Sequence, residues 1–322
     1  MTIYLVTGGA GFIGSHITTG LVERGDRVHV LDNFSSGLRG NLAHLDVGAP
    51  GSGAAVEIFE GDIVDPAACL AAARGVHGIL HEAAQVSVPQ SLADPMRSVG
   101  VNVMGTLNLL EAAREVGAAR FVMAASSAAY GESEALPKHE AMSVSPLSPY
   151  AAGKVAGENL CAVYSHCHGL VTVPLRYFNV FGPRQADDSP YTGVIAIFAR
   201  ALLEGRAPTI FGDGGQTRDF TYVDNVVAAN LAALSADVPG GAVINVGAGE
   251  RISLNELFEA MAEYLQVDLK PLYAEARGGD VRHSLASLER AQEWLGYEAK
   301  VHWREGLGRT LEWYKAQHLA SR

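Results

Sequence analysis

A glycine-rich turn near the start of the chain limits the folds that this sequence can adopt. The apolar run Ile3 to Val6 leads into T-G-G-A-G-F-I-G, which places Gly8, Gly11 and Gly14 in a G-x-x-G-x-x-G spacing directly before a helical pattern. Glycines at these steps let the backbone turn tightly and approach a pyrophosphate, which then lies at the positive end of the helix. A plain strand-to-helix turn would not explain strand, spacing and helix together. The turn therefore predicts a dinucleotide site.

Short β-branched runs alternate with longer runs rich in alanine and leucine through the first half of the chain. This alternation is typical of βαβ units, whose right-handed crossovers build a parallel sheet with helices on both faces. The expected strands are Ile3 to Val6, Arg27 to Leu31, Val56 to Phe59, Gly78 to His81, Arg120 to Ala124 and Val171 to Arg176. The expected helices are Phe12 to Glu23, Pro66 to Ala73, Val101 to Val116 and Pro149 to His168. Gly25, Gly117 and Gly169 stand where helices should end.

After Arg176 the rhythm loosens into connections rich in glycine and proline, which indicates a smaller lobe. The sequence thus predicts an α/β fold, with a doubly wound parallel sheet of the Rossmann type and a smaller, mixed α/β lobe. We assign residues 1–176 to the dinucleotide domain and 177–322 to the substrate lobe. Within the latter, 221–246 is expected to rejoin the first sheet. Residues Gly48 to Ala55 are expected to form a surface loop.

The composition excludes several classes of protein. A chain of 322 residues with 48% hydrophobic and 18% charged residues is typical of a soluble globular protein. The net charge of −11 argues against a nucleic-acid partner, which needs a dense basic face. We expect no signal peptide and no membrane segment, because the opening lacks a basic leader and no apolar stretch is long enough.

The cysteines Cys69, Cys161 and Cys167 form no disulfide framework, which fits the cytoplasm. The cluster His166-Cys167-His168 lacks the partner pair that a metal site needs, and we interpret it as a helix end before Gly169. We therefore expect no metal.

Residues after the later strands are placed to select and hold the cofactor. Asp32 closes the second strand, about where the adenosine ribose of a dinucleotide lies, and its carboxylate accepts from a 2′-hydroxyl but repels a 2′-phosphate. NAD is therefore favoured over NADP. Asp62 can accept from the adenine amino group, and the small Ala83 and Ala84 leave room for the cofactor, although either feature could be an ordinary loop.

A possible chemical site lies where the fifth strand ends at Ser126 and the next helix begins with Tyr150 and Lys154. The Y-x-x-x-K spacing puts both side chains on one helical face, so that the ammonium can stabilise a phenolate. A free tyrosine, with a pKa of about 10, is almost wholly protonated at neutral pH. Such a pair is common by chance, but together with the glycine-rich turn it indicates a base. The expected cofactor contacts are Gly8, Gly11, Phe12, Ile13, Gly14, Asp32, Asn33, Asp62, Ile63, Ala83, Ala84, Tyr150 and Lys154.

The chain resembles the extended short-chain dehydrogenases/reductases, and among them the UDP-hexose 4-epimerases, over essentially its whole length. The shared motifs are T-G-G-A-G-F-I-G-S, S-S-A-A-Y-G, Y-A-A-G-K, L-R-Y-F-N-V-F-G-P-R-Q, G-Q-T-R-D-F-T-Y-V-D-N and R-G-G-D-V-R-H-S. The last two belong to the nucleotide-sugar branch. The resemblance implies NAD-dependent 4-epimerisation of a UDP-hexose through a 4-keto sugar, with NAD regenerated in each cycle.

The resemblance also implies roles for individual residues. Ser126 would bond the sugar O4, Tyr150 would remove its proton, and Lys154 would hold the nicotinamide ribose. The residues implied for the UDP-sugar are Val86, Ser126, Ser127, Ala128, Tyr150, Asn179, Phe211, Arg218, Arg277, Asp280 and Ser284. Among these, Asn179, Arg218 and Arg277 are expected on the UDP, Phe211 on the uracil and Asp280 on the nucleotide ribose. The two arginines could instead form surface ion pairs, and Asn179 could be a turn residue.

The sugar itself is predicted from Ser284. In the family, the residue four positions after the Asp of the R-x-G-D turn lies beside the hexose, and a tyrosine there excludes an N-acetyl group. Here that residue is a serine, and G-D-V-R-H-S is similar to the UDP-N-acetylglucosamine 4-epimerases. We expect interconversion of UDP-GlcNAc and UDP-GalNAc, and of UDP-Glc and UDP-Gal as well.

Three other functions use the same fold and cofactor. Related dehydratases and decarboxylases carry an acidic residue within three positions after the strand-end serine, where this chain has Ser127, Ala128 and Ala129. A UDP-glucuronate 4-epimerase remains an alternative, because Arg184 could pair with a sugar carboxylate. A non-catalytic NAD-sensing protein is a further one, although such proteins commonly lose the tyrosine or lysine.

The resemblance also implies a homodimer, formed through the helices Val101 to Val116 and Pro149 to His168. The small residues on these helices could pack against a partner or face the sheet. They are Ala112, Ala113, Ala156 and Ala162.

Overall fold

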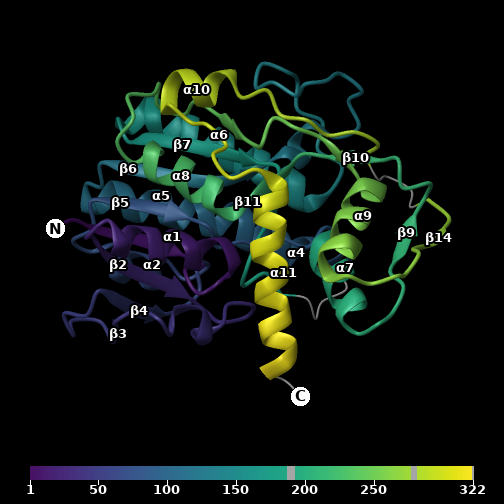
Figure 1. Ribbon diagram of the computed structural model, residues 1–322. Helices are drawn as coiled ribbons and strands as arrows, with labels where there is room; N and C mark the ends of the chain where they lie inside the picture. Colours follow the sequence, from purple (N-terminus) through teal and green to yellow (C-terminus); the bar gives the residue numbers. More distant parts are fainter. Residues whose placement is uncertain (187–192, 277–280, 321–322) are drawn as a thin grey trace.

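The computed structural model describes residues 1–186, 193–276 and 281–320. Its main feature is an eight-stranded sheet with the order β12-β7-β6-β5-β1-β2-β4-β3, in which every neighbouring pair is parallel (Figure 1). The strands are β1 (Ile3–Thr7), β2 (Arg27–Asp32), β3 (Val47–Gly48), β4 (Val56–Glu60), β5 (Gly78–His81), β6 (Arg120–Ser126), β7 (Val171–Tyr177) and β12 (Ile244–Val246). The expected doubly wound parallel sheet is confirmed.

Helices cover both faces of this sheet. Side chains alternate along a strand, so Leu80 of β5 contributes to one core and its neighbour Ile79 to the other. The core on the side of Leu80 is closed by α1 (Phe12–Glu23), α8 (Val223–Ala233) and α10 (Glu289–Leu295). The opposite core is closed by α2 (Pro66–Ala73), α5 (Thr106–Val116) and α6 (Pro149–His168). The connection between β5 and α5 holds α3 (Val88–Ala93), α4 (Pro95–Val99) and the π-helix η2 (Gly100–Gly105).

Local chemistry sets the ends of α6 as the sequence predicts. Ser148 caps its start, since the serine hydroxyl oxygen accepts from the backbone N–H of Ala151 at 3.1 Å. Gly169 ends it with a left-handed backbone, φ 68°. The cluster 166–168 is therefore the last turn of a helix. Among the residues that the structure describes, no group of three His, Cys, Asp or Glu side chains could hold a metal ion.

A smaller lobe is built from short strand pairs and three helices. They share a core that is separate from the two cores of the large sheet. Figure 1 shows α7, α9, β9 and β14 together beside the large sheet, with α11 next to them. The strand pairs are β8 (Asn179–Phe181) with β11 (Phe220–Tyr222), β9 (Thr209–Phe211) with β14 (Leu272–Ala274), and β10 (Thr217–Arg218) with β13 (Ile252–Ser253). The helices are α7 (Val194–Leu203), α9 (Leu254–Leu265) and α11 (Trp303–Ala320). Within the described part of the chain, no helix could span a membrane.

The chain returns from the small lobe to the large sheet twice. The first return is the expected one, in which β12 pairs with β7 and Ile244 lies opposite Leu175. The second, at α10, was not expected. It buries Ala291 and Leu295 in the core of the large sheet, and the Tyr297 hydroxyl donates to the Gly247 carbonyl at 2.7 Å. The division at residue 176 stays a prediction.

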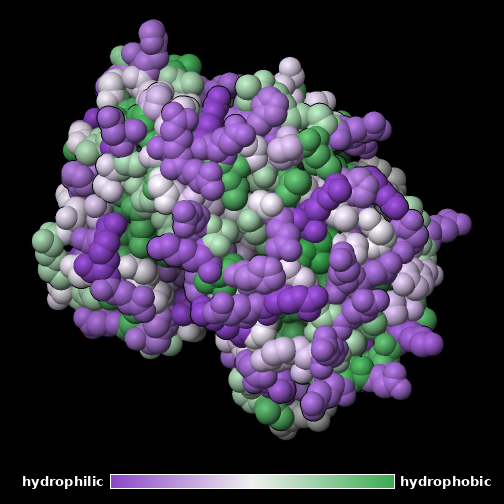
Figure 2. Space-filling model, turned by 45° about the horizontal axis from the view of Figure 1, so that its top comes forward, coloured by the Kyte–Doolittle hydropathy of each residue, from purple (hydrophilic) through white to green (hydrophobic). Residues whose placement is uncertain are grey.

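The outer side of α10 faces solvent, where Glu289 and Glu293 are exposed. Figure 2 shows that hydrophilic residues make up most of the face that lies towards the top of Figure 1. Hydrophobic residues reach the surface there in small separate groups. For α10 this is expected, because its apolar residues Ala291 and Leu295, four positions apart, point into the core.

The helix expected over Val101 to Val116 is not uniform. Its first part is the π-helix η2, and the α-helix α5 begins only at Thr106. In this wide turn the Asn102 side-chain amide makes two hydrogen bonds to the backbone of Gln85. It accepts from the N–H of Gln85 at 2.9 Å and donates to its carbonyl at 3.0 Å, and we call this pair of bonds the clamp. Such a contact between distant residues overrides the regular helical period.

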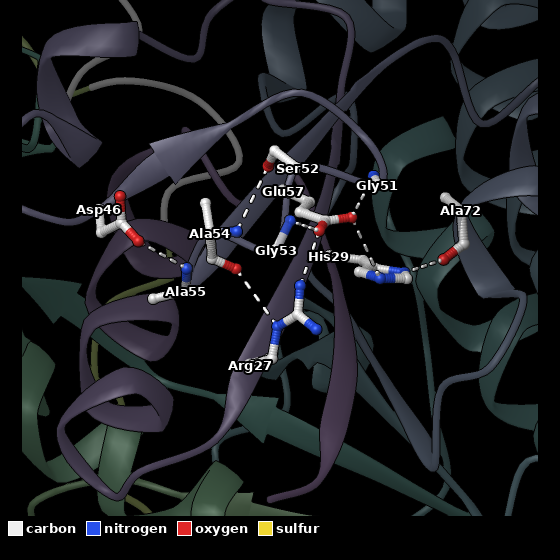
Figure 3. A network of polar contacts seen from close by, with 10 residues as sticks. All are labelled: Arg27, His29, Asp46, Gly51, Ser52, Gly53, Ala54, Ala55, Glu57 and Ala72. Atoms are coloured by element: carbon white, nitrogen blue, oxygen red, sulfur yellow. Dashed lines mark hydrogen bonds and ion pairs between the residues drawn. The ribbon is translucent and has the colours of Figure 1, made fainter.

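The surface loop expected over Gly48 to Ala55 is wrong at its first residue, since Gly48 belongs to β3. The rest is a turn held by the buried carboxylate of Glu57 on β4 (Figure 3). Glu57 accepts from the backbone N–H groups of Gly51 at 2.8 Å and Gly53 at 2.9 Å, and from the Arg27 guanidinium at 2.7 Å. The hydrogen bond from Gly51, then those from Gly53 and Arg27, hold the pKa of Glu57 below its ordinary value.

Candidate active site

The glycine-rich turn has the shape that a dinucleotide requires. Gly8 has a φ of +64°, and a Cβ there would lie 2.9 Å from the backbone of Ala83. A Cβ on Gly14 would lie 2.2 Å from the Gly8 carbonyl oxygen, and the Gly11 N–H donates to that same oxygen at 2.9 Å. Gly11 then caps α1 in an extended conformation. The first N–H groups of the helix are thus exposed to an approaching anion, as a pyrophosphate needs. Phe12 and Ile13 form the first turn and are half-buried.

The end of β2 holds a carboxylate in a fixed position. Asp32 is 7% exposed, and its side chain accepts from the backbone N–H groups of Ala10 at 3.0 Å and Phe34 at 2.8 Å. Gly37 leaves the space in front of it, because a Cβ on that residue would lie 2.8 Å from the Asp32 carboxylate. The carboxylate therefore lies at the carboxyl end of β2, beside the glycine-rich turn. This placement fits the ribose of NAD.

The other expected cofactor residues cluster around the same edge. The Asn33 amide donates to the Asp62 carboxylate at 2.8 Å, which links the ends of β2 and β4. Ile63 is buried, and its carbonyl accepts from the Asn108 amide at 3.0 Å. Ala83 and Ala84 are half-buried after β5, and the Ala83 N–H donates to the Thr7 hydroxyl at 3.2 Å. The residues present therefore fit a dinucleotide laid across the carboxyl ends of the parallel strands.

Ser126, Tyr150 and Lys154 come together at the end of β6. A side-chain hydrogen bond joins Ser126 and Tyr150. The Lys154 ammonium donates to the Ala124 carbonyl at 2.8 Å and lies 6.0 Å from the centroid of the Tyr150 ring. Burial raises the pKa of Tyr150, the bond to Ser126 lowers it, and the charge of Glu82 raises it. Without cofactor the phenol is therefore held in its protonated form.

Burial also acts on the cations and carboxylates next to this group. Lys154 is 4% exposed, and burial lowers its pKa to about 8, against the opposite effects of Glu82 and Glu158. Burial raises the pKa of Glu82 to about 7, while a hydrogen bond from Tyr177 and the charge of Lys154 lower it. Groups that titrate near neutral pH at the end of a sheet are typical of proton-transfer sites.

The described residues among those expected on the sugar nucleotide lie on several separate segments. Asn179 is exposed at the start of β8, and Phe211 is half-buried at the end of β9. The Arg218 guanidinium donates to the Thr217 carbonyl at 3.0 Å, and the Ser284 N–H donates to that carbonyl at 3.1 Å. Arg277 and Asp280 lie outside the described residues. Ser127 and Ala128 are half-buried in the 3₁₀-helix η3 (Ser127–Tyr130), and Val86 is 68% exposed.

Comparison with known proteins places the chain in a family. Residues 4–247 match the model of the NAD dependent epimerase/dehydratase family. The UDP-glucose 4-epimerase of Mycolicibacterium smegmatis is 41% identical over 97% of this chain and 98% of its own. A crystal structure of UDP-glucose 4-epimerase with UDP-glucose from Thermotoga maritima superposes with a TM-score of 0.92 at 37% identity, covering 98% of this chain and all of that one. A UDP-N-acetylglucosamine 4-epimerase from Methanobrevibacter ruminantium, in complex with UDP-N-acetylmuramic acid, gives 0.91 at 37% identity, covering 98% and 99%.

The chain belongs to the NAD dependent epimerase/dehydratase family. Within it, the protein is a nucleotide-sugar 4-epimerase whose cofactor is NAD. The resemblance to UDP-hexose 4-epimerases is thereby confirmed. Tyr150 and Lys154 are both in place. The protein is an enzyme of this family and not a non-catalytic relative.

The structure of the epimerase brings out two residues that the sequence did not single out. Asp219 is fully buried, and it accepts from the N–H groups of Ala248 at 2.7 Å, Gly249 at 3.1 Å and Ala286 at 3.1 Å. It thus joins the segments that carry Arg218 and Ser284. Glu82 is the second, and its carboxylate accepts from the Tyr177 hydroxyl at 2.9 Å. Asp219 lies within G-Q-T-R-D-F-T-Y-V-D-N and Glu82 directly precedes Ala83, but the face on which a side chain lies is not visible in the sequence.

Proposed function

We propose that this epimerase interconverts the C4 epimers of UDP-hexoses, both UDP-GlcNAc with UDP-GalNAc and UDP-Glc with UDP-Gal. Three relatives named for UDP-sugars, each at least 37% identical over nearly the whole chain, support UDP as the nucleotide. We assign Arg218 and Arg277 to the diphosphate, whose oxygens suit planar guanidinium groups. Asn179, Phe211 and Asp280 complete the proposed nucleotide site.

The proposed chemistry uses the three residues at the end of β6. Tyr150 takes the proton from the sugar O4, Ser126 donates a hydrogen bond to that oxygen, and the charge of Lys154 favours the phenolate. NAD, when bound, would supply the hydride-transfer chemistry at C4. Val86, Ser127 and Ala128 are proposed to line the sugar pocket. A ligand held mainly by its nucleotide leaves the hexose free to turn over.

The place of Ser284 carries the proposal for the sugar. Its segment is fixed by backbone hydrogen bonds to two other parts of the chain. The Ser284 N–H donates to the Thr217 carbonyl at 3.1 Å, and the neighbouring Leu285 carbonyl accepts from the Lys138 N–H at 2.7 Å. Thr217 precedes Arg218 on β10, and Lys138 lies on the connection between Ser126 and Tyr150. A small, half-buried side chain between the nucleotide strand and the catalytic connection leaves space for an acetamido group.

A panel of UDP-sugars tests this proposal. The wild-type enzyme should convert UDP-GlcNAc and UDP-Glc, each followed by product analysis at C4. Ser284→Tyr fills the proposed space, so its kcat/KM should fall about 10- to 100-fold more on UDP-GlcNAc than on UDP-Glc. Ser284→Ala is the matched control and should keep both activities. Conversion of UDP-Glc with no conversion of UDP-GlcNAc by the wild type would contradict the role of Ser284.

UDP-glucuronate belongs in the same panel, and one contact argues against it. Arg184 was the cation available for a sugar carboxylate. Its guanidinium donates to the hydroxyls of Ser15 at 3.3 Å and Thr19 at 3.2 Å on α1, and lies 3.3 Å from the His44 ring nitrogen. Arg184 is thus bound to side chains of α1, and we expect UDP-glucuronate to be the poorest substrate of the panel.

We also propose a homodimer that uses α5 and α6. Of the small residues expected at the interface, Ala112 and Ala113 are buried within the chain and cannot reach a partner. Ala156 is half-buried, and Ala162 is exposed. Exposed large apolar side chains on the same side support the proposal, since Met104 is 48% and Val163 is 51% exposed. Light scattering at micromolar concentration should give the mass of two chains, and the Val163→Glu variant should give the mass of one.

A further inference from the structure

Lys154 carries a buried positive charge that its hydrogen bond to the Ala124 carbonyl does not neutralise. The residue is 4% exposed, and its ammonium donates to the carbonyl oxygen of Ala124. A carbonyl is a neutral acceptor, and an ammonium out of water is costly unless an opposite charge lies nearby. Two carboxylates interact with this ammonium, those of Glu82 and Glu158.

Glu158 is already neutralised by another partner. It lies four residues after Lys154 on α6, but both of its oxygens accept from the Arg176 guanidinium, at 2.8 and 2.7 Å. The side chains of this pair are only 5% and 4% exposed. A bidentate pair of this kind leaves little net charge to act on a third group. Glu82 therefore acts on Lys154 more strongly than Glu158 does.

The sheet brings Glu82 to the right place. His81 pairs with Met123 across β5 and β6, so the next residue, Glu82, comes level with Ala124, whose carbonyl holds Lys154. The Tyr177 hydroxyl donates to the Glu82 carboxylate at 2.9 Å. Asn230 on α8 donates to the oxygen of that hydroxyl at 2.7 Å. This chain of hydrogen bonds fixes the carboxylate on the face of the sheet opposite to α6.

We propose that Glu82 is the counter-charge of Lys154 and a positioning residue for the proton transfer at Tyr150. This inference rests on the roles of Tyr150 and Lys154 in the proposed function. Acting from the far face of the sheet, the negative charge of Glu82 keeps the lysine in its ammonium form when the site is closed to water. Glu82 touches neither the sugar nor the reacting oxygen in this account.

The other ionisable groups around the pair do not replace Glu82. His81 is fully buried, and burial, with the charge of Lys154, lowers its pKa to about 3, so the ring is neutral. Burial, with the charge of Glu82, raises the pKa of Tyr177 well above its ordinary value, so this hydroxyl is a neutral donor. Arg176 is bound to Glu158. The remaining neighbour is Tyr150 itself, whose pKa the charge of Glu82 raises.

The sign of the expected effect follows from one rule. Removing a negative charge lowers the pKa of every ionisable group close to it. In Glu82→Gln, the pKa of Tyr150 and that of Lys154 should therefore both fall. Both limbs of the pH profile of kcat/KM should move to lower pH, by about 1 unit. A residue that only supports the fold would lower the height of the profile and leave its position unchanged.

Two matched variants sharpen the test. Glu82→Asp keeps the charge, and its profile should stay close to that of the wild type. Tyr177→Phe keeps the carboxylate but removes its donor, which makes Glu82 easier to protonate, so the profile should move in the same direction as in Glu82→Gln but by less. Tyr177→Phe also serves if Glu82→Gln does not fold.

A second readout needs no sugar. Ultraviolet absorbance of the phenolate, titrated in wild type and in Glu82→Gln with a Tyr150→Phe background subtracted from each, isolates one of the eleven tyrosines. The midpoint for Tyr150 should be lower in Glu82→Gln. Equal midpoints, or an equal shift in Glu82→Asp, would overturn the proposal. Because no turnover is involved, this result is independent of whether the proposed 4-epimerisation is correct.

Discussion

Two glutamates on the same parallel sheet have pKa values shifted in opposite directions. Glu57, near the amino end of β4, accepts from the N–H groups of Gly51 and Gly53 and from a guanidinium, and its pKa is lowered. Glu82, just past the carboxyl end of β5, has a hydrogen bond from Tyr177, and burial raises its pKa. Hydrogen bonds to the carboxylate outweigh burial at Glu57, whereas burial outweighs the single hydrogen bond from Tyr177 at Glu82.

The two glutamates have different roles, since Glu57 holds a loop and Glu82 acts on ionisable neighbours. A carboxylate surrounded by donors stays ionised and ties a loop to the sheet, as Glu57 does for the turn after β3. A carboxylate with fewer donors keeps a charge that acts on its neighbours and titrates close to neutral pH, as Glu82 does. In parallel sheets the carboxyl end is where ligands bind, and the site of this epimerase lies there.

The largest expected effect comes from Tyr150, the proposed base. Tyr150→Phe removes the oxygen that accepts the proton, so turnover should fall by about 10²- to 10⁴-fold. The fold and NAD binding should be kept, because the aromatic ring still packs at the start of α6. Steady-state kinetics and a fluorescence titration with NAD measure the two quantities. Turnover within a few-fold of the wild type would mean that another group is the base.

Glu57→Gln should lower the stability of the fold and leave turnover unchanged. Removing this charge weakens three hydrogen bonds and should lower the free energy of unfolding by about 1 to 3 kcal/mol, with kcat and its pH profile unchanged. Urea unfolding together with kinetics makes the measurement. A shift of the pH profile in this variant would show that the two glutamates do not have separate roles.

A smaller effect is expected from pH on the stability that Glu57→Gln loses. The folded pKa of Glu57 is lowered, so its contribution to stability is present above the ordinary pKa of a glutamate and is lost as the pH falls through the lowered value. The difference in stability between wild type and Glu57→Gln should therefore be larger at neutral pH than at about pH 4. Urea midpoints at both pH values measure it, and a constant difference would contradict the assignment.

The sequence predicted the parts of this fold that are local. The six strands expected before residue 177, the helix bounds of α1, α2 and α6, and the ends at Gly117 and Gly169 follow from apolar periods and from glycines with positive φ. The cofactor turn could be predicted as well, because its glycines are required by backbone contacts within a few residues and with the end of β5.

What the sequence missed depends on contacts between distant residues. The π-helix η2 accompanies the clamp of Asn102 on Gln85, and α10 joins the large sheet through Ala291 and Tyr297. Neither contact leaves a period in the sequence. Glu82 directly precedes Ala83 and Ala84 in the sequence, but its importance appears only when Tyr177 is seen beside it.

In the proposed reaction the C4 hydride leaves the sugar and returns to it within a single site. One isotope experiment follows this hydride. UDP-glucose carrying deuterium at C4 is incubated with the wild-type enzyme and NAD, and the products are analysed by NMR. The account predicts UDP-galactose with the deuterium still at C4 and no net formation of NADH. Unchanged configuration at C4, or product in which solvent hydrogen has replaced the deuterium, would contradict it.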